Sequence, residues 1–167
     1  MAEHAHSDLH RYFPDDDGPA VDRNGLEILT RDECLELLGS AQLGRVAITR
    51  YALPAILPVN YAMLGDDIVF ATGTGSKSLA INHETVIAFE VDAIDPTART
   101  GWSVLAVGKA RPFDERDADL AAAKQLDLDP WVGRHAVGLI RMPTDLLSGR
   151  RITVPTTAAH PDPTRWR

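Results

Sequence analysis

Between residues 43 and 113 the sequence alternates apolar and polar residues in segment after segment, and short connections separate most of these segments. Alternation with a period of two is typical of a strand that has one buried face. Parallel neighbours would need crossover connections of a dozen or more residues. The strands are therefore expected to pair antiparallel. Closing them into a small barrel would remove the exposed sheet edges.

The segment "PAILPVNYAML" shows the alternation most clearly. Leu57, Val59 and Tyr61 fall on one face, and Pro58 and Asn60 fall on the other. Because proline cannot donate a hydrogen bond to a ladder, two prolines in this segment predict a sheet edge or a bulge. The "GDD" that follows predicts a hairpin turn.

Further strands are expected on both sides of this hairpin. Gly108 lies inside the longest of them and indicates a bulge or a barrel corner. A segment near the C-terminus, 145–154, is expected to extend the sheet. The other predicted strands are 44–49, 68–72, 84–94, 101–113 and 135–142.

Two segments predict helices. Thr30 is a good N-cap with Glu33 at the capping-box spacing, and Cys34, Leu35 and Leu38 then share one helical face. The segment 114–126, "DERDADLAAAKQL", is also expected to be helical. The fold class is therefore mainly β, an antiparallel barrel of about six strands with a few peripheral helices.

The 167 residues suggest one domain, and the net charge of −7 argues against non-specific nucleic-acid binding. No apolar run approaches the length of about 20 residues that spans a membrane. With one cysteine and no secretory apolar segment, the chain is expected in the cytoplasm. The expected organisation is a flexible acidic tail over 1–24, the barrel domain over 25–153, and a flexible tail over 154–167.

Chemistry is concentrated in the segment "VFATGTGSKSLAIN", residues 69–82. Gly73 and Gly75 allow backbone N–H groups to converge on an anion, Ser76 can cap a following helix, and Lys77 adds a positive charge. Neither the Walker pattern nor the dinucleotide pattern matches. The residues alone leave two alternatives open, a phosphate site and a capped turn.

A resemblance covers about 120 residues, from Asp32 to about Ile152. Five segments follow one another along the chain, namely the opening helix, the hairpin with its Gly-Ser-Lys loop, "VIAFEVDAID", "GWSVLAVGKARPF" and "SGRRI". In this order they resemble the pyridoxamine 5′-phosphate oxidase-like family. The chain resembles in particular its branch of nitroimidazole-resistance proteins and flavin or deazaflavin oxidoreductases. This resemblance implies a six-stranded split β-barrel that pairs as a homodimer, with FMN in the groove between the subunits.

The resemblance also implies cofactor-binding residues. Ser76 and Lys77 would hold the FMN phosphate with the backbone around Thr74 and Gly75. Arg141 or Arg150 is a candidate for a second positive charge. The residues expected to contact the rest of the flavin are Pro58, Val59, Asn60, Tyr61, Ala71, Thr72, Trp102 and Ser103. A core position for Tyr61 and an end-cap position for Trp102 are the structural alternatives.

The expected function is an FMN-dependent oxidoreductase that transfers hydride between a reduced nicotinamide and a small organic acceptor. The alternatives are a reductase that uses the deazaflavin coenzyme F-420 and a non-catalytic flavin or haem binder. The sequence shows no catalytic triad and no metal site, and the catalytic residues stay unassigned. Some nitroimidazole-resistance proteins have a histidine where this chain has Phe70 or Ala71, so nitroimidazole reduction is not expected here.

Overall fold

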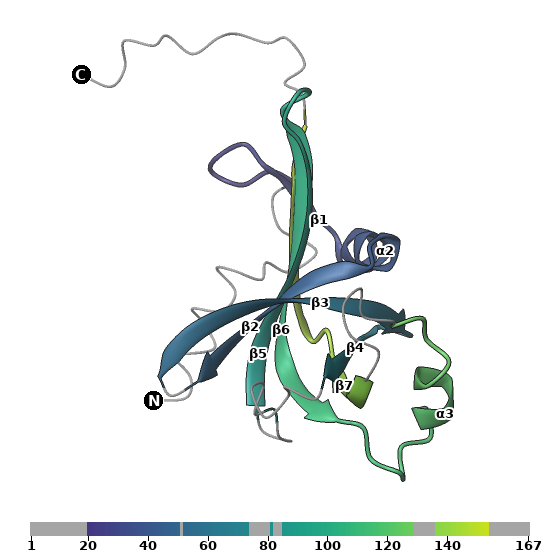
Figure 1. Cartoon of the computed structure of the whole chain (residues 1–167). Helices are drawn as coiled ribbons and strands as arrows, with labels where there is room; N and C mark the ends of the chain where they lie inside the picture. The colour runs from purple at the N-terminus through teal and green to yellow at the C-terminus, as the bar shows by residue number, and fades with distance from the viewer. Residues whose placement is uncertain (1–19, 51, 74–80, 82–84, 129–135, 154–167) are drawn as a thin grey trace, which may run out of the picture.

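The computed structural model describes residues 20–50, 52–73, 81, 85–128 and 136–153 (Figure 1). Within these ranges eight strands and two helices form one unit. In chain order they are β1 (Glu27–Leu29), α2 (Arg31–Ser40), β2 (Leu43–Arg50), β3 (Leu53–Leu64), β4 (Asp67–Gly73), β5 (Thr85–Asp95), β6 (Thr100–Pro112), α3 (Leu120–Ala123), β7 (Ala136–Met142) and β8 (Leu146–Ile152).

Six of these strands close a barrel. The strand order β6-β5-β2-β3-β4-β7 returns to its start because β7 pairs again with β6. All of the pairings are antiparallel. The expectation of a six-stranded antiparallel split barrel is confirmed.

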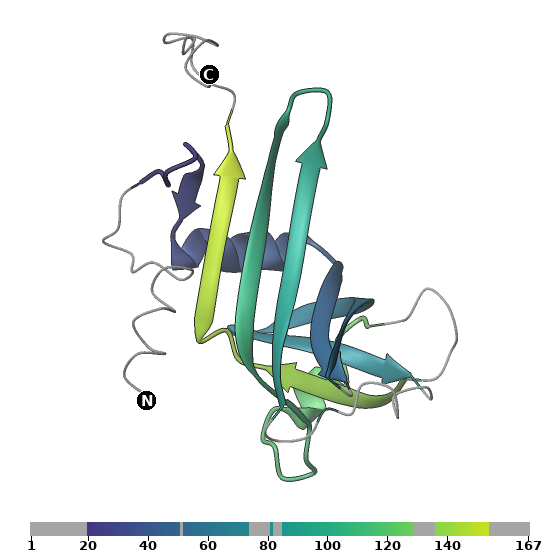
Figure 2. The ribbon, with the colours of Figure 1, turned by 90° about the vertical axis from the view of Figure 1, so that its left-hand side faces the viewer.

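The split arises because β6 has two neighbours on one side. Residues 101–107 of β6 pair with β8, whereas Arg111 and Pro112 pair with β7. Gly108 lies at this change of partner, and its pairing with Ile87 on β5 continues without a shift. Of the two alternatives for Gly108, the structure shows the barrel corner. Figure 2 shows β8 beside the β5–β6 hairpin, with α2 crossing behind them.

Helix α2 begins as the sequence predicts. The Thr30 hydroxyl accepts a hydrogen bond from the Glu33 backbone N–H at 3.3 Å, and the Glu33 carboxylate accepts one from the Thr30 N–H at 2.9 Å. Cys34 and Leu38 are buried where the helix packs against β8, β3 and β6. The predicted capping box is confirmed.

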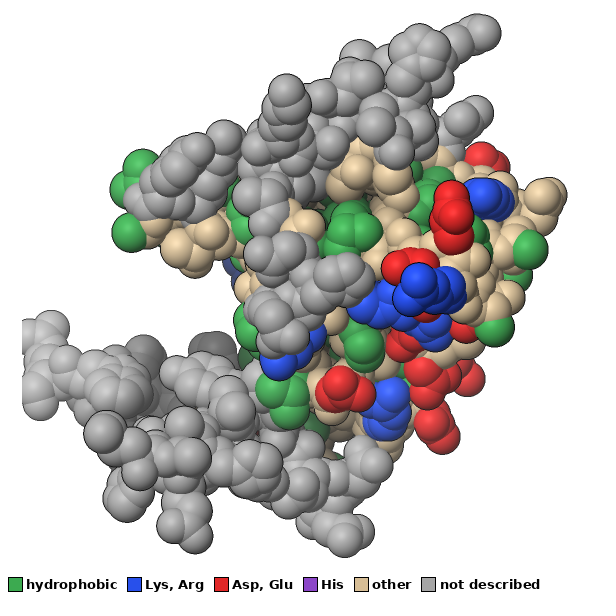
Figure 3. Space-filling model, turned by 90° about the horizontal axis from the view of Figure 1, so that it is seen from below, with side chains coloured by type: hydrophobic (Ala, Val, Ile, Leu, Met, Phe, Trp, Pro, Cys, Tyr) green, Lys and Arg blue, Asp and Glu red, His purple; other side chains and the backbone are tan. Residues whose placement is uncertain are grey.

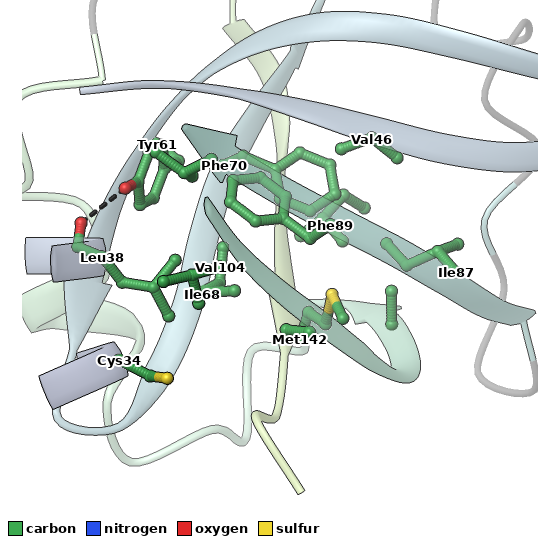
Figure 4. Close-up of a cluster of buried hydrophobic side chains, with 14 of the residues drawn as sticks. Cys34, Leu38, Val46, Tyr61, Ile68, Phe70, Ile87, Phe89, Val104 and Met142 are labelled. Carbon is green, nitrogen blue, oxygen red and sulfur yellow. Dashed lines mark hydrogen bonds between the residues drawn. The ribbon is translucent and has the colours of Figure 1, made fainter. Parts of the chain in front are cut away.

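The core fills the barrel with the alternating residues of its strands. Figure 4 shows Phe70, Phe89 and Tyr61 at its centre, with Val46 and Ile87 beside them. The Tyr61 ring meets the Phe89 ring edge-on, with 4.8 Å between the ring centroids. The shared face predicted for Leu57, Val59 and Tyr61 is confirmed, because Tyr61 belongs to this core and the other two pack against it.

A polar network joins three connections at one end of the barrel. Thr144 is 2% exposed, and its hydroxyl donates to the Asp66 carbonyl at 2.9 Å and accepts from the Arg31 guanidinium at 3.1 Å. Arg31 also donates to the Thr144 carbonyl at 2.7 Å. These bonds fix the start of α2, the β3–β4 turn and the β7–β8 connection relative to one another.

The helix expected over 114–126 is wrong in extent, because the structure has only the short helix α3. The Asp117 carboxylate binds the Asp114 backbone N–H at 2.6 Å and the Arg111 guanidinium, which holds residues 114–117 in a turn. Aspartate side chains compete in this way with the helical hydrogen bonds of the backbone. Strand β1, which pairs with β8, was not expected.

In the view from below, acidic and basic side chains lie next to one another and not in patches of one sign (Figure 3). In the described ranges, neither helix has the length and apolar content needed to cross a bilayer.

Candidate functional site

The first part of β3 has one open edge among the described strands. Residues 53–60 pair only with β2, and β4 joins from Tyr61 onward. The Tyr61 N–H bonds to the Gln42 carbonyl at 3.1 Å, so by alternation the peptide groups of Ile56 face the open edge. Pro54 and Pro58 stand at equivalent positions, where a missing N–H costs the ladder nothing. The predicted edge location of the two prolines is confirmed.

Strand β4 separates from β3 at the same place. Beyond Phe70 it pairs only with β7, through Ala71 to Leu139 and Thr72 to Gly138. The Thr72 hydroxyl donates to the Gly138 carbonyl at 3.2 Å. We call this place, defined by residues 58–60 of β3 and 71–72 of β4, the β3–β4 junction. It brings together five of the sequence-predicted site residues.

The phosphate loop continues directly from the junction. Strand β4 ends at Gly73, and the predicted phosphate-binding residues Thr74, Gly75, Ser76 and Lys77 lie outside the described residues. Their role therefore stays a prediction from the sequence.

Tyr61 is a core residue, which is the structural alternative named above. It is 2% exposed, and its hydroxyl donates to the Leu38 carbonyl. Burial raises the pKa of the Tyr61 hydroxyl well above its usual range. Val59 also packs against the core, whereas Pro58 and Asn60 alternate to the outer face of the sheet. A ligand at the junction therefore meets the side chains of Pro58 and Asn60.

Trp102 and Ser103 lie on opposite faces of β6. Trp102 packs against the core side, in register with Ala93 and Arg151. Ser103 is on the outer face, which it shares with Pro58 and Asn60. Three strand steps separate Ser103 from Asn60, or roughly 14 Å at the usual strand spacing. Within one chain, therefore, the structure does not bring Trp102 or Ser103 to the junction.

An apolar row crosses the outer face of the sheet beside the junction. It is formed by register partners on five adjacent strands, namely Ile56, Ala47, Ala88, Val107 and Leu146. Ile56 is 68% exposed at the open edge of β3. The other four residues are partly buried. A partly exposed apolar stripe of this length is typical of a surface that another protein or a ligand covers.

Beside the apolar row lies an ionic cluster. The Arg45 guanidinium contacts the Glu90 carboxylate at 3.1 Å and also the Asp92 carboxylate. Burial and the charge of Asp92 raise the pKa of Glu90, and Arg45 opposes this shift. The two arginines considered for the phosphate have carboxylate partners in the structure. Arg141 pairs with Asp67 and Asp119, and Arg150 pairs with Asp22 at 3.4 Å.

The segment 113–128, which contains α3, is anchored over the outer side of β4 and β7. Arg111 holds Asp117 with two bonds of 2.7 Å, and Arg141 reaches Asp119 at 3.1 Å. The hydrogen bonds from Arg111 and from the Asp114 N–H hold the pKa of Asp117 well below its usual range. The ionised form of Asp117 therefore stabilises the folded protein.

We expect Asp117→Asn to lower the stability of the protein at pH 7. A carboxylate with a depressed pKa contributes stability above its unfolded pKa, near 3.8 for Asp117, and loses it as the pH falls through the folded value. The difference in urea midpoint between wild type and Asp117→Asn should therefore shrink as the pH falls below 3.8. Asp127→Asn, at an exposed position of the same segment, is the control. A constant difference between pH 7 and pH 3 would contradict the assignment.

Comparisons with known proteins agree with this geometry. The family model described as pyridoxamine 5′-phosphate oxidase matches residues 30–151. An uncharacterized protein of Mycobacterium tuberculosis, Rv0080, is 37% identical over 129 residues, which cover 74% of this chain and 84% of that protein.

Solved structures show the same fold. The FAD binding protein from Mycobacterium smegmatis is 31% identical with a TM-score of 0.63, over 76% of this chain and 98% of that one. An FAD-binding protein from Mesorhizobium loti is 18% identical with a TM-score of 0.65, over 77% of this chain and 99% of that one. The second likeness is one of fold alone.

Proposed function

Because this chain belongs to the pyridoxamine 5′-phosphate oxidase family, we propose that it binds a flavin nucleotide at the β3–β4 junction and acts as a flavin-dependent oxidoreductase. FMN is the form that the sequence resemblance implies, and FAD is the form named for the Mycobacterium smegmatis relative. Both contain the isoalloxazine ring and a phosphate on the ribityl chain, so the same residues would serve either one.

The observation that carries this proposal is the open edge of β3 beside the separated end of β4. The polar edge of a flavin ring needs a donor and an acceptor in one plane, which the N–H and C=O of Ile56 offer on the open edge. The flat face of the ring needs an apolar surface, which Pro58 and Ala71 offer. The residues of the junction therefore fit the ring.

The phosphate would be bound where β4 ends. Ser76 and Lys77, together with the backbone of Thr74 and Gly75, follow the junction directly in the sequence. Glycine-flanked N–H groups, a hydroxyl and an ammonium group suit a phosphate ester.

We also propose that the protein is a homodimer with a flavin at each subunit contact. Ser103 is roughly 14 Å from the junction of its own chain at the usual strand spacing. It lies on the outer face with the apolar row, so a second subunit seated on that row could bring its Ser103 to the flavin. The row would lose its exposure to water in the same step. Trp102 has no place in this scheme, because its side chain lies on the core side.

When bound, the flavin supplies the hydride chemistry between a reduced nicotinamide and a small organic acceptor. The chain's own residues bind and orient the ring through the β3 edge, and the covering subunit excludes water from it. No acid–base residue is needed at the junction for this task.

Absorption spectroscopy of the purified protein tests the proposal. We expect the two visible bands of an oxidised flavin, and chromatography of the released cofactor then distinguishes FMN from FAD. A Soret band would favour haem, and a single deazaflavin band would favour coenzyme F-420. A colourless protein that takes up neither FMN nor FAD would refute flavin binding. Oxidation of NADH or NADPH separates an enzyme from a carrier.

Lys77→Ala is expected to weaken flavin binding by roughly 10- to 100-fold, because a hydrogen bond to a charged group contributes about 1.5–3 kcal/mol. Fluorescence titration of the flavin-free protein measures the dissociation constant. Arg116→Ala, which removes an exposed charge from another loop, should leave the constant unchanged. Equal affinity of Lys77→Ala and wild type would refute the phosphate assignment.

A further inference from the structure

A groove lies between the outer side of β4 and β7 and the segment 113–128. It has a volume of about 480 Å³, within the range of small-molecule sites. One wall is formed by Ala71 and its register partner Leu139. The opposite wall is formed by Phe113, Leu120, Leu126 and Leu128.

The groove is held open by defined contacts. The paired bonds between Arg111 and Asp117 and the contact between Arg141 and Asp119 anchor the segment to the barrel. The Arg141 guanidinium also lies over the Phe113 ring, 5.8 Å from its centroid. The segment therefore cannot fall onto β4 and β7 and close the groove without breaking these contacts.

The charge of the groove is balanced. Its charged lining residues are one cation, Lys124, and one carboxylate, Glu115, and both residues are exposed. The remaining lining side chains with large surfaces are apolar. Such a lining favours a ligand without net charge, since an isolated ion would lose hydration without gaining a matching group.

The position of the groove connects it to the proposed flavin. Ala71 belongs both to the β3–β4 junction and to the groove wall. A molecule in the groove would therefore lie next to a flavin bound at the junction.

We propose that this groove binds the organic electron acceptor, and that the acceptor is an uncharged, largely apolar compound of two or three fused rings. This inference rests on the proposed function. In the overall reaction the reduced nicotinamide gives up a hydride and solvent supplies one proton. The acceptor leaves with two additional electrons and two protons.

Dye binding tests the groove separately from the redox reaction. Nile red, an uncharged apolar dye, should bind the wild-type protein with increased fluorescence, and anilinonaphthalene sulfonate, an anion of similar size, should bind at least tenfold more weakly. Leu139→Trp and Leu120→Trp fill the groove from its two walls and should each weaken Nile red binding at least tenfold. Ala122→Trp adds the same ring at an exposed position of α3 that does not line the groove, and binding should be unchanged.

Turnover tests the acceptor class. Leu139→Trp should raise KM for menadione, an uncharged two-ring oxidant, while ferricyanide reduction and flavin content stay as in wild type. If the protein binds no flavin but Nile red binding still depends on Leu139 and Leu120, the proposed function fails and the apolar groove stands. If flavin binds but Leu139→Trp and Leu120→Trp change neither Nile red binding nor the menadione KM, the groove assignment is overturned. Tighter binding of the anionic dye would overturn the charge argument.

Discussion

Gly44→Ala is expected to destabilise the barrel by about 3 kcal/mol or more, at the upper end of overpacking effects. A Cβ atom at Gly44 would lie 2.2 Å from Cζ of Phe89. The Phe89 ring has no free space to move into, because it is fully buried between Tyr61 and Phe70. Alanine at residue 44 therefore forces either the ring or strand β2 out of place.

Urea denaturation followed by circular dichroism measures this effect. Gly39→Ala is the matched control, because nothing lies within 4 Å of a Cβ at that helix position and alanine favours a helix. We expect Gly39→Ala to equal or exceed the wild-type midpoint. A Gly44→Ala protein as stable as wild type would show that β2 does not approach Phe89 as closely as described.

Ile56→Glu is expected to abolish dimer formation and to weaken flavin binding at the same time. Ile56 is 68% exposed in the single chain and begins the apolar row beside the open edge of β3. In the proposed dimer a glutamate there would be a buried charge without a partner, which is strongly unfavourable. Because the second subunit would complete the flavin site, we expect the flavin dissociation constant to rise at least about tenfold.

Light scattering coupled to gel filtration measures the mass, and titration of the flavin-free protein measures the affinity. Val21→Glu introduces the same charge at another exposed apolar position, 54% exposed, and should leave both quantities unchanged. An Ile56→Glu protein that stays dimeric would exclude the apolar row as the subunit contact. A monomer with full flavin affinity would show that one chain forms the whole site.

Local sequence signals predicted most of the barrel because each strand has one buried face. The alternation of Ile87, Phe89 and Val91 matches the buried side of β5, and the capping residues Thr30 and Glu33 match the start of α2. The location of β3 at a sheet edge was predicted because Pro58 has no N–H to donate to a neighbouring strand. These features depend on neighbours within a few residues, which the sequence displays directly.

Features that depend on long-range contacts were harder to predict. The helix predicted over 114–126 is limited to α3 in the structure, because Asp117 pairs with Arg111 on β6. The helix propensity of residues 114–126 gives no information on that contact, because it depends only on residues close together in the sequence. The grouping of Trp102 with Ser103 could have been questioned from the sequence, since consecutive residues of a strand point to opposite faces. By the same rule, the side chains of Tyr61 and Asn60 point to opposite faces of β3.

The pairing of β1 with β8 places the entry and the exit of the barrel domain next to each other, with Glu27 opposite Arg151. A short peptide could therefore join these ends, and new termini could be opened at the Gly65–Asp66 turn, so the domain is a candidate for circular permutation.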